Sequence, residues 1–443
     1  MTRSRKGKSA EAPAAKLSAR AVRTGESPIS RIMADALAHP DVISLAAGFV
    51  DYETLPVEET REAIEDLLSD ETTARAALQY GITKGLPALR ERLAVRLAEA
   101  DGKALGTAGY TPENVVIGTG SQQLLYLLSE VLLDPDDIVI LGHPSYLVFM
   151  DALRSSGVTC RRVPLDDEGM RTDVLRQVFE DLRAEGRLDR VRMIYVVSYF
   201  QNPTGLSLSE TRRREILDLV ETFSTDHRIH VVEDAAYRDL RYEGDDVPSI
   251  RSFDEDGDTV VHLRTFSKPF APGLRTGYGL FPSELAAQVE YLKGAHDFGS
   301  ANFAQHLYVR ILDKGLYDRH VKVLCERYRT RRDVMLEALG KGMPTGVSWT
   351  RPHGGLYVWL TLPGSIGTGP DSKLFRAALD RGVAYIPGEL CFADCPGGDV
   401  PRNCLRLSFG VGTIEKIAEG VRRLAEAVKG CLRDVPAGER DAS

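Results

Sequence analysis

The segment from Thr265 to Arg275 gathers side chains that can do covalent and anion-binding chemistry. Thr265 and Ser267 carry hydroxyls, Lys268 carries a primary amine, and Arg275 follows a bend rich in proline and glycine. A lysine amine can form a Schiff base with a carbonyl compound, while hydroxyls and a guanidinium group can hold a phosphate. A lone lysine is more often a solvated surface residue, so this interpretation needs partner groups elsewhere in the chain.

A second candidate anion site is the segment Gly118-Thr119-Gly120-Ser121-Gln122, between an apolar stretch and a predicted helix. Free backbone N–H groups and the positive end of a helix dipole favour an anion at such a turn. The segment matches neither GxGxxG nor GxxxxGK[ST], and a tight strand-to-helix turn would use the same glycines. Phosphate binding and a purely structural turn are therefore both consistent with this segment alone.

Polar side chains also follow two other apolar stretches. Glu233 and Asp234 come at the end of a predicted strand, and Tyr237 lies three residues beyond Asp234. A carboxylate buried there needs a partner, because an isolated buried charge is very costly, and a positively charged ring nitrogen would be one. Asn202 offers an amide at the same kind of position, although its turn-forming Asn-Pro-Thr-Gly would also suit a bland loop. Together with Lys268, these groups match what a pyridoxal phosphate site requires.

The elements that must position these groups follow from an alternation of short apolar stretches with longer amphipathic segments, which begins near residue 114. We expect strands at 115–117, 138–141, 193–197, 230–233 and 260–263, and helices at 122–133, 146–155 and 209–223. Such alternation is typical of a mainly parallel sheet covered by helices on both faces, with ligands at the carboxyl ends of the strands. The candidate groups described above all follow predicted strands.

Helices are also expected at 27–39, 58–68 and 87–100. A serine cap and a proline in the first turn indicate the start of the first, and a proline in the first turn indicates the start of the last. After about residue 330 the pattern changes to a helix at 331–339, strands at 347–350, 355–360 and 405–409, and a closing helix at 414–428. The predicted fold class is α/β, with a mainly parallel central sheet between helices and a smaller α+β domain.

The composition is that of an ordinary folded chain without a general attraction for nucleic acid. Of 443 residues, 56 are Lys or Arg and 64 are Asp or Glu, which gives a formal charge of −8. Nucleic-acid affinity rests largely on basic groups that neutralise phosphates. No apolar run approaches the roughly 18 residues that span a bilayer, and the basic N-terminal residues lack the apolar region of a secretory signal. We expect a disordered N-terminal tail, with an organellar presequence or a nucleic-acid-binding tail as alternatives.

The six cysteines are too sparse for a disulfide framework and predict reduced thiols in a cytoplasmic protein. Cys391, Cys395 and Cys404 lie close together in the sequence. A metal site would need a fourth ligand, and no nearby Cys or His provides one at finger-like spacing. We therefore expect structural thiols and no metal.

Four motifs in a fixed order are those of a known family: Asn-Pro-x-Gly, Asp-x-x-Tyr, Ser-Lys-x-x-x-Pro-Gly-Leu-Arg and a late Asn-x-x-Arg. With them the chain resembles the fold-type-I, class I/II pyridoxal-phosphate-dependent aminotransferases, and especially the kynurenine and 2-aminoadipate aminotransferases. The resemblance extends from about Ser27 to Val428. It implies an enzyme that moves an amino group from an L-amino acid to a 2-oxo acid by a ping-pong mechanism.

The resemblance also implies roles for single residues. Lys268 would bind the cofactor covalently and act as general base, and Asp234 would pair with the ring nitrogen. Asn202 and Tyr237 would bind the ring oxygen, and Tyr146 would stack on the ring. The phosphate would be held by Gly120, Ser121, Gln122, Thr265, Ser267 and Arg275.

Other residues are matched to the substrate and to a second subunit. Tyr80 corresponds to a tyrosine that reaches the phosphate of the neighbouring subunit, which implies a homodimer with composite active sites. Arg406 corresponds to the arginine that binds the substrate α-carboxylate, a role that suits its planar fork. Asn202 would also contact the substrate, and Gly48 belongs to the segment that closes over it. Arg31 lies where relatives direct an arginine toward the substrate side chain, but it is equally consistent with a solvated helix residue.

The substrate itself is not fixed by the resemblance, because the residues from Ala46 to Tyr52 depart from the Gly-Gly and proline-containing pattern common in this subgroup. Relatives with the same lysine and aspartate catalyse elimination, decarboxylation or oxidation at Cα, so an enzyme of that kind is the alternative function. A transcriptional regulator with an aminotransferase-like domain is a third, disfavoured hypothesis, since the residues before the first predicted helix are too few for a winged helix.

The expected domain organisation has five parts. They are a disordered tail at 1–26, an N-terminal segment at 27–60 that joins the small domain, a large cofactor-binding domain at 61–325, a small C-terminal domain at 326–432 and a tail at 433–443.

Overall fold

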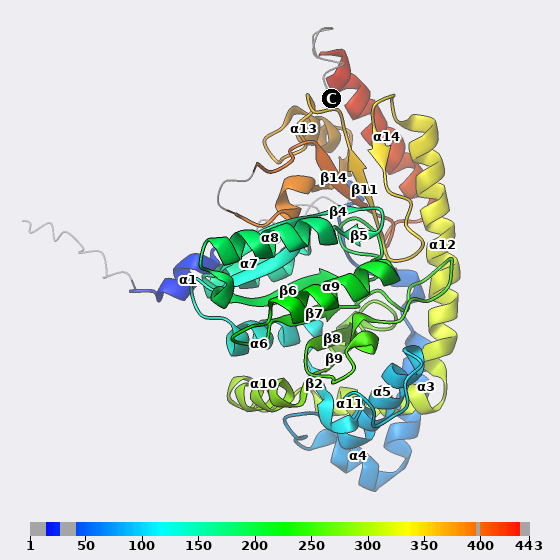
Figure 1. Ribbon diagram of the computed structural model, residues 1–443. Helices are drawn as coiled ribbons and strands as arrows, with labels where there is room; N and C mark the ends of the chain where they lie inside the picture. Colours follow the sequence, from blue (N-terminus) through cyan, green and yellow to red (C-terminus); the bar gives the residue numbers. More distant parts are fainter. Residues whose placement is uncertain (1–14, 27–40, 396–398, 435–443) are drawn as a thin grey trace, which may run out of the picture.

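The centre of the molecule is an eight-stranded sheet (Figure 1). The computed structural model describes residues 15–26, 41–395 and 399–434. Along the sheet the strand order is β2-β9-β8-β7-β6-β3-β4-β5. The strands are β2 (Val115–Gly118), β3 (Ile138–His143), β4 (Thr159–Asp166), β5 (Gly169–Met170), β6 (Val191–Val197), β7 (His230–Asp234), β8 (Val260–Thr265) and β9 (Gly277–Leu280). Strands β8, β7, β6, β3 and β4 pair in parallel, while β9 is antiparallel to both neighbours, so the predicted mainly parallel sheet is confirmed.

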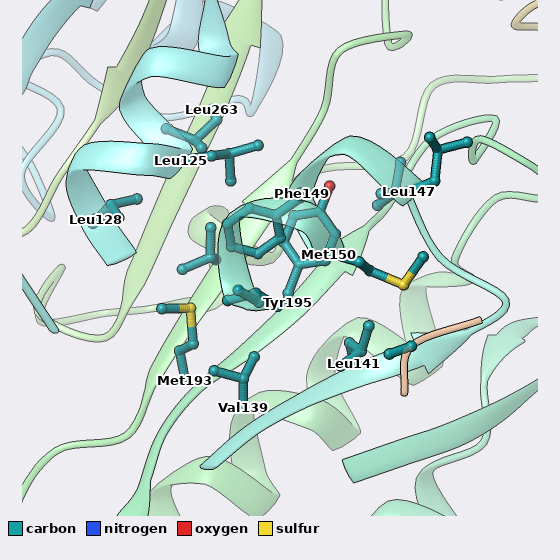
Figure 2. Close-up of a cluster of buried hydrophobic side chains, with 14 of the residues drawn as sticks. Leu125, Leu128, Val139, Leu141, Leu147, Phe149, Met150, Met193, Tyr195 and Leu263 are labelled. Atoms are coloured by element: carbon teal, nitrogen blue, oxygen red, sulfur yellow. The ribbon is translucent and has the colours of Figure 1, made fainter. Parts of the chain in front are cut away.

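Helices cover both faces of this sheet because its central strands are apolar on both sides. Successive residues of a strand point to opposite faces. Ile138 and Ile140 of β3 pack in the cluster formed with α8 (Thr172–Ala184) and α9 (Glu210–Phe223). Val139 and Leu141 pack on the other face, in the cluster that includes Leu125, Leu128 and Phe149 (Figure 2). The helices on that second face are α6 (Ser121–Leu132), α7 (Leu147–Ser156) and α10 (Ser283–His296).

A further group of helices covers the β2 end of the sheet. It consists of α3 (Val57–Ser69), α4 (Glu71–Leu78), α5 (Pro87–Ala100) and α11 (Asn302–Asp313). Val115 and Ile117 of β2 pack against α5 and α11 in one buried cluster. Helix α5 has the predicted bounds, with proline in its first turn, where its missing N–H costs no hydrogen bond.

The C-terminal part forms a second, antiparallel sheet in the order β10-β11-β14-β13. Its strands are β10 (Ser348–Trp349), β11 (Tyr357–Thr361), β13 (Ile386–Pro387) and β14 (Cys404–Ser408), and its helices are α13 (Lys373–Asp380) and α14 (Ile414–Arg433). Strand β1 (Ile43–Ser44) pairs in parallel with β12 (Val383–Ala384). The N-terminal segment is therefore attached to the C-terminal part of the molecule.

Helix α12 (Leu316–Gly342) connects the two parts and runs along one side of the molecule (Figure 1). It passes without interruption through the expected domain boundary at residues 325 and 326. Short 3-10 helices lie at Tyr52–Thr54, Pro112–Asn114, Leu188–Arg190, Ile250–Phe253, Pro272–Leu274 and Gly388–Cys391.

Residues 15–26 differ from the expected disordered tail. Residues Ala19–Thr24 form helix α1, which Ser18 caps by accepting a hydrogen bond from the Ala21 N–H. Arg20 of α1 forms an ion pair with Glu130, and the Arg23 guanidinium donates to the Ser155 carbonyl at 3.2 Å. These contacts with α6 and α7 supply the partners that a short isolated helix lacks. The helix expected at 27–39 lies outside the described residues, as does Arg31.

Within the described ranges, no helix combines the length and apolar character needed to cross a bilayer. All six cysteines are free thiols, and burial raises the pKa of Cys391 to about 12 and that of Cys395 to about 11. In the same part of the chain, no three His, Cys, Asp or Glu side chains are arranged to hold a metal ion.

Candidate active site

The carboxyl ends of β2, β3, β6, β7 and β8 meet at one edge of the large sheet, where they surround a cavity of about 140 Å³. Apart from Val197 and Ala236, its lining consists entirely of residues predicted to bind a cofactor. These are Gly120, Ser121, Gln122, Tyr146, Asn202, Asp234, Tyr237, Thr265, Ser267, Lys268 and Arg275. The structure thus brings together every predicted cofactor-binding residue except Tyr80.

One end of the cavity is built to hold an anion. Gly120 precedes α6 with φ of +79°, and a Cβ there would lie 2.9 Å from Nη2 of Arg275. The free N–H groups at the start of α6 therefore lie beside a guanidinium group. The Thr265 hydroxyl donates to Ser267 Oγ at 3.1 Å and accepts from the Ser267 N–H at 3.1 Å. A helix N-terminus, a cation and two hydroxyls at one place are the groups that a phosphate needs.

Lys268 extends from the loop that follows β8. Its Nζ donates to the Gly48 carbonyl oxygen at 2.8 Å. This hydrogen bond places the amine beside the segment that the resemblance expects to close over the substrate. Lys268 is only partly buried and forms no ion pair within the described residues. Its amine is therefore available for chemistry at the cavity.

Asp234 ends β7 and is buried. Its Oδ2 accepts a hydrogen bond from the Tyr195 hydroxyl at 3.0 Å, and its Oδ1 accepts one from the Ala236 N–H at 3.1 Å. Burial raises the pKa of this carboxyl to about 6, an effect that the two hydrogen bonds only partly offset. No cation pairs with Asp234 among the residues that the structure describes. A cationic group that entered the cavity would stabilise the ionised carboxylate.

Two tyrosines meet across the boundary between the large and small sheets. The hydroxyls of Tyr237 and Tyr357 lie 3.2 Å apart, and burial raises the pKa of Tyr237 well above its usual value. Burial likewise raises the pKa of Tyr146. Both cavity tyrosines are therefore neutral hydroxyl groups at physiological pH, able to donate hydrogen bonds.

Arg406 brings a fixed positive charge from β14 to the cavity residues. Its Nη1 donates to Asn202 Oδ1 at 2.7 Å, and its Nη2 donates to the Ala46 carbonyl at 2.7 Å. The guanidinium lies 4.3 Å from the centroid of the Tyr357 ring, and the buried Nε has no hydrogen-bond partner. A cation held in this way, next to Asn202, is suited to bind a carboxylate.

Tyr80 lies away from the cavity of its own chain. Its side chain is 83% exposed and packs edge-on against Phe298, with 5.8 Å between the ring centroids. The other predicted substrate residue, Gly48, lies next to the cavity through its contact with Lys268.

Tyr195 and Tyr357 contact the candidate site, but the sequence did not single them out. Both lie inside apolar strands, β6 and β11, where an aromatic residue is typical of the hydrophobic core. Only the spatial pairing of strands reveals their hydroxyl contacts, so no sequence signal could have found them.

Comparisons with known proteins show which family this chain is similar to. The family model for aminotransferase class I and II matches residues 40–424. The aromatic-amino-acid aminotransferase 1 of Thermococcus litoralis is 39% identical over 88% of each chain. The 2-aminoadipate transaminase of Thermus thermophilus is 35% identical over 89% of this chain and 91% of its own. A crystal structure of Pyrococcus horikoshii kynurenine aminotransferase in complex with PMP is 36% identical, covers 94% of this chain and 97% of its own, and has a TM-score of 0.85.

Proposed function

The chain belongs to the aminotransferase class I and II family, and we propose that the cavity at its strand ends holds pyridoxal 5′-phosphate on Lys268. As a member of this family, the protein is a pyridoxal-phosphate-dependent aminotransferase that transfers an amino group from an amino acid to a 2-oxo acid in a ping-pong cycle. The observation that best supports the proposed location is the shared cavity of the lysine, the buried aspartate and the anion-binding groups.

The residues present fit this cofactor. The buried Oε1 of Gln122 has no hydrogen-bond partner, and Asp234 has no cationic partner in the described structure. A Cβ at Gly277 would come within 2.3 Å of the Ser121 nitrogen, so the backbone at the start of α6 is closely packed and preformed. A phosphate group and a protonated ring nitrogen would satisfy the two ends of the cavity.

When bound, pyridoxal phosphate supplies an electron-accepting ring that stabilises negative charge at the substrate Cα. Lys268 would act as the general base at this carbon, because its amine lies at the cavity. The Asp234 carboxylate would favour a proton on the ring nitrogen, and that cation would in turn favour the ionised form of Asp234. Tyr237 and Asn202, which also line the cavity, would orient the ring through hydrogen bonds to its oxygen.

Arg406 and Asn202 orient the substrate. Arg406 donates one hydrogen bond to Asn202 and one to the Ala46 carbonyl. A substrate α-carboxylate would compete for these two N–H donors. The planar fork allows two parallel hydrogen bonds to the carboxylate, which fixes the direction in which Cα faces the ring.

We expect Arg406→Lys to raise KM for the amino acid and to lower kcat/KM by roughly 10- to 100-fold, because an ammonium group keeps the charge but loses the two-pronged contact. Steady-state kinetics measures this change, and the absorbance of the bound cofactor should stay unchanged. The exposed Arg402 on the preceding loop provides the control Arg402→Lys. An unchanged KM in Arg406→Lys would contradict the assignment.

A homodimer is supported by an exposed apolar patch around Tyr80. Leu78, Tyr80, Ile82 and Phe298 are between 51% and 83% exposed, and the Thr83 hydroxyl donates to the Phe298 carbonyl at 2.8 Å. Exposed apolar surface of this kind commonly marks an interface. We propose that a second copy covers this patch and that Tyr80 reaches the phosphate site of that copy, next to the exposed Arg275.

The variant Tyr80→Phe tests this arrangement. We expect it to remain a dimer, because the ring is kept, but to bind the cofactor about tenfold more weakly, because one hydrogen bond to a charged phosphate is lost. Light scattering measures the molar mass and titration of the apoprotein measures the affinity, with the exposed Tyr291→Phe as control. A monomeric wild type, or an unchanged cofactor affinity in Tyr80→Phe, would rule the composite site out.

The relatives named above indicate aromatic amino acids, 2-aminoadipate and kynurenine as the first amino donors to test. With one donor and no acceptor, the protein should produce one equivalent of 2-oxo acid per chain and retain the amino group on the cofactor. Addition of a 2-oxo acid should then restore the starting absorbance. Release of carbon dioxide, thiol or peroxide without amino transfer would instead favour elimination, decarboxylation or oxidation.

We further propose that residues 61–325 form the large domain and that residues 27–60 and 326–432 form the small one. The pairing of β1 with β12 supports this division. A cytoplasmic location is supported by the six free cysteines.

A further inference from the structure

Tyr195 contacts the carboxylate that the proposed function pairs with the ring nitrogen, although Tyr195 is not itself a lining residue of the cavity. Its hydroxyl donates to Asp234 Oδ2 at 3.0 Å. Tyr195 lies in β6, and the parallel register pairs it with Val232, two residues before Asp234 in β7. Because side chains alternate along a strand, Val232 and Asp234 point to the same face, and Tyr195 reaches along this face to the carboxylate.

The Tyr195 hydroxyl is held in place by the packing of its ring. The ring lies against Phe149 of α7, with 4.5 Å between centroids and an interplanar angle of 49°. Figure 2 shows the two rings side by side, with Leu141 and Met150 among their neighbours. Phe149 and Tyr195 are fully buried. The hydrogen bond to Asp234 is therefore shielded from water and has a fixed direction.

Apart from the Tyr195 hydroxyl and the Ala236 N–H, the groups near Asp234 do not favour its charge. Glu233 carries a like charge, although its side chain has its own partners, with Oε2 2.8 Å from His262 Nδ1 and Oε1 accepting from Ser198 at 2.7 Å. Tyr146, just before α7, lines the same cavity as Asp234 and is a neutral hydroxyl because burial raises its pKa. The two donors that favour the ionised carboxylate are the Ala236 N–H and the Tyr195 hydroxyl. Of these, only Tyr195 is a side chain that a substitution can remove.

We propose that Tyr195 is a positioning residue that keeps the Asp234 carboxylate ionised and directed at the ring nitrogen of the cofactor. The inference rests on the proposed function, since it assumes that Asp234 pairs with that nitrogen. It predicts that removing the Tyr195 hydroxyl weakens the interaction with the ring nitrogen and leaves the phosphate contacts intact.

The test compares how apoproteins bind pyridoxal phosphate and an analogue in which a C–H group replaces the ring nitrogen. The variant is Tyr195→Phe, which removes one oxygen and leaves the ring packed on Phe149, so it should fold. The matched control is Tyr110→Phe, because the buried Tyr110 hydroxyl donates to Asp101 Oδ2 at 2.8 Å, a tyrosine–carboxylate pair outside the cavity. Thermal unfolding of each apoprotein confirms that it is folded.

We expect Tyr195→Phe to bind pyridoxal phosphate about tenfold more weakly than the wild type and to bind the analogue with unchanged affinity. Tyr110→Phe should bind both compounds as the wild type does. In the loaded enzyme, kcat of Tyr195→Phe should fall about tenfold while KM for the amino acid stays the same.

Two results would overturn the inference, and they are distinguishable. If the wild type prefers pyridoxal phosphate over the analogue and Tyr195→Phe keeps the full preference, Asp234 acts on the ring nitrogen without help from Tyr195. If the wild type itself shows no preference, or binds neither compound, the proposed role of Asp234 fails together with the inference.

Discussion

Replacing Lys268 with alanine is expected to lower the rate of transamination by roughly 10²- to 10⁴-fold, the contribution of a well-placed general base, and to remove covalent attachment of the cofactor. Lys268 is the lysine that lines the cavity, and its Nζ is held at 2.8 Å from the Gly48 carbonyl. The rate is measured as 2-oxo acid formed under single-turnover conditions.

Two further measurements separate the loss of the base from a loss of structure. Small primary amines added to Lys268→Ala should restore part of the rate, because they can enter the cavity and move the same proton. Lys268→Arg keeps the positive charge, but its guanidinium holds its proton at any physiological pH and should be as slow as the alanine variant. A rate within tenfold of the wild type in either variant would exclude Lys268 as the base.

The variant Asp234→Asn is expected to lower kcat by about 10²-fold or more, because an amide cannot balance a positive charge on the ring nitrogen in a buried site. The affinity of the apoprotein for pyridoxal phosphate should fall as well. The binding of the amino acid, which depends on Arg406, should change much less. Kinetics and cofactor titration together check this expectation, and an unchanged kcat would refute the pairing.

The same substitution should make the apoprotein more stable above pH 6. The carboxyl pKa of Asp234 is about 6 in the folded protein against a usual value of 3.8, so the folded state binds the proton more tightly than the unfolded state. Stability from this group is therefore greatest at low pH and is lost as pH rises through 6, at a cost on the order of 3 kcal/mol. Asparagine carries no charge and avoids that cost.

Urea unfolding of the two apoproteins at pH 5 and pH 8 measures the effect. At pH 8 the free energy of unfolding of the variant should exceed that of the wild type by up to about 3 kcal/mol. Any loss of the hydrogen bonds with Tyr195 and Ala236 reduces this difference. At pH 5 the difference should be smaller. Saturating pyridoxal phosphate should reverse the order by stabilising the wild type more. An advantage that does not change with pH would show that the charge of Asp234 is not its cause.

The parts of the fold that could be predicted from sequence are those buried on both faces. Strands β3, β6, β7 and β8 are near-continuous apolar runs because helices cover them on both sides, and each was expected close to its observed position. Strand β4 was not expected, since its Cys-Arg-Arg-Val-Pro stretch contains charges and a proline. Strand β9 was not expected either, because its glycines interrupt the apolar pattern of a strand. Helix α12 begins fifteen residues before its expected start at residue 331, because charged residues interrupt the apolar pattern in its first half.

For the candidate site, too, the sequence predicted the residues at strand ends but not the contacts that form between distant strands. The cavity residues lie at the end of a strand or in the segment after it, so the rule that ligands bind at the carboxyl ends of parallel strands predicted that they would lie together. The contact between Arg406 and Asn202 joins two sheets, and only the resemblance linked these residues to one substrate. The hydroxyl contacts of Tyr195 and Tyr357 depend on tertiary packing that no local pattern encodes.

Pyridoxal phosphate bound to Lys268 in this cavity is what the proposed function requires above all. Borohydride reduction of the protein loaded with pyridoxal phosphate, followed by digestion and mass spectrometry of the peptides, tests it most directly. We expect one phosphopyridoxyl group per chain, on the peptide that contains Lys268 and at that residue. A label on another lysine, or no label on a protein that still binds the cofactor, would contradict it.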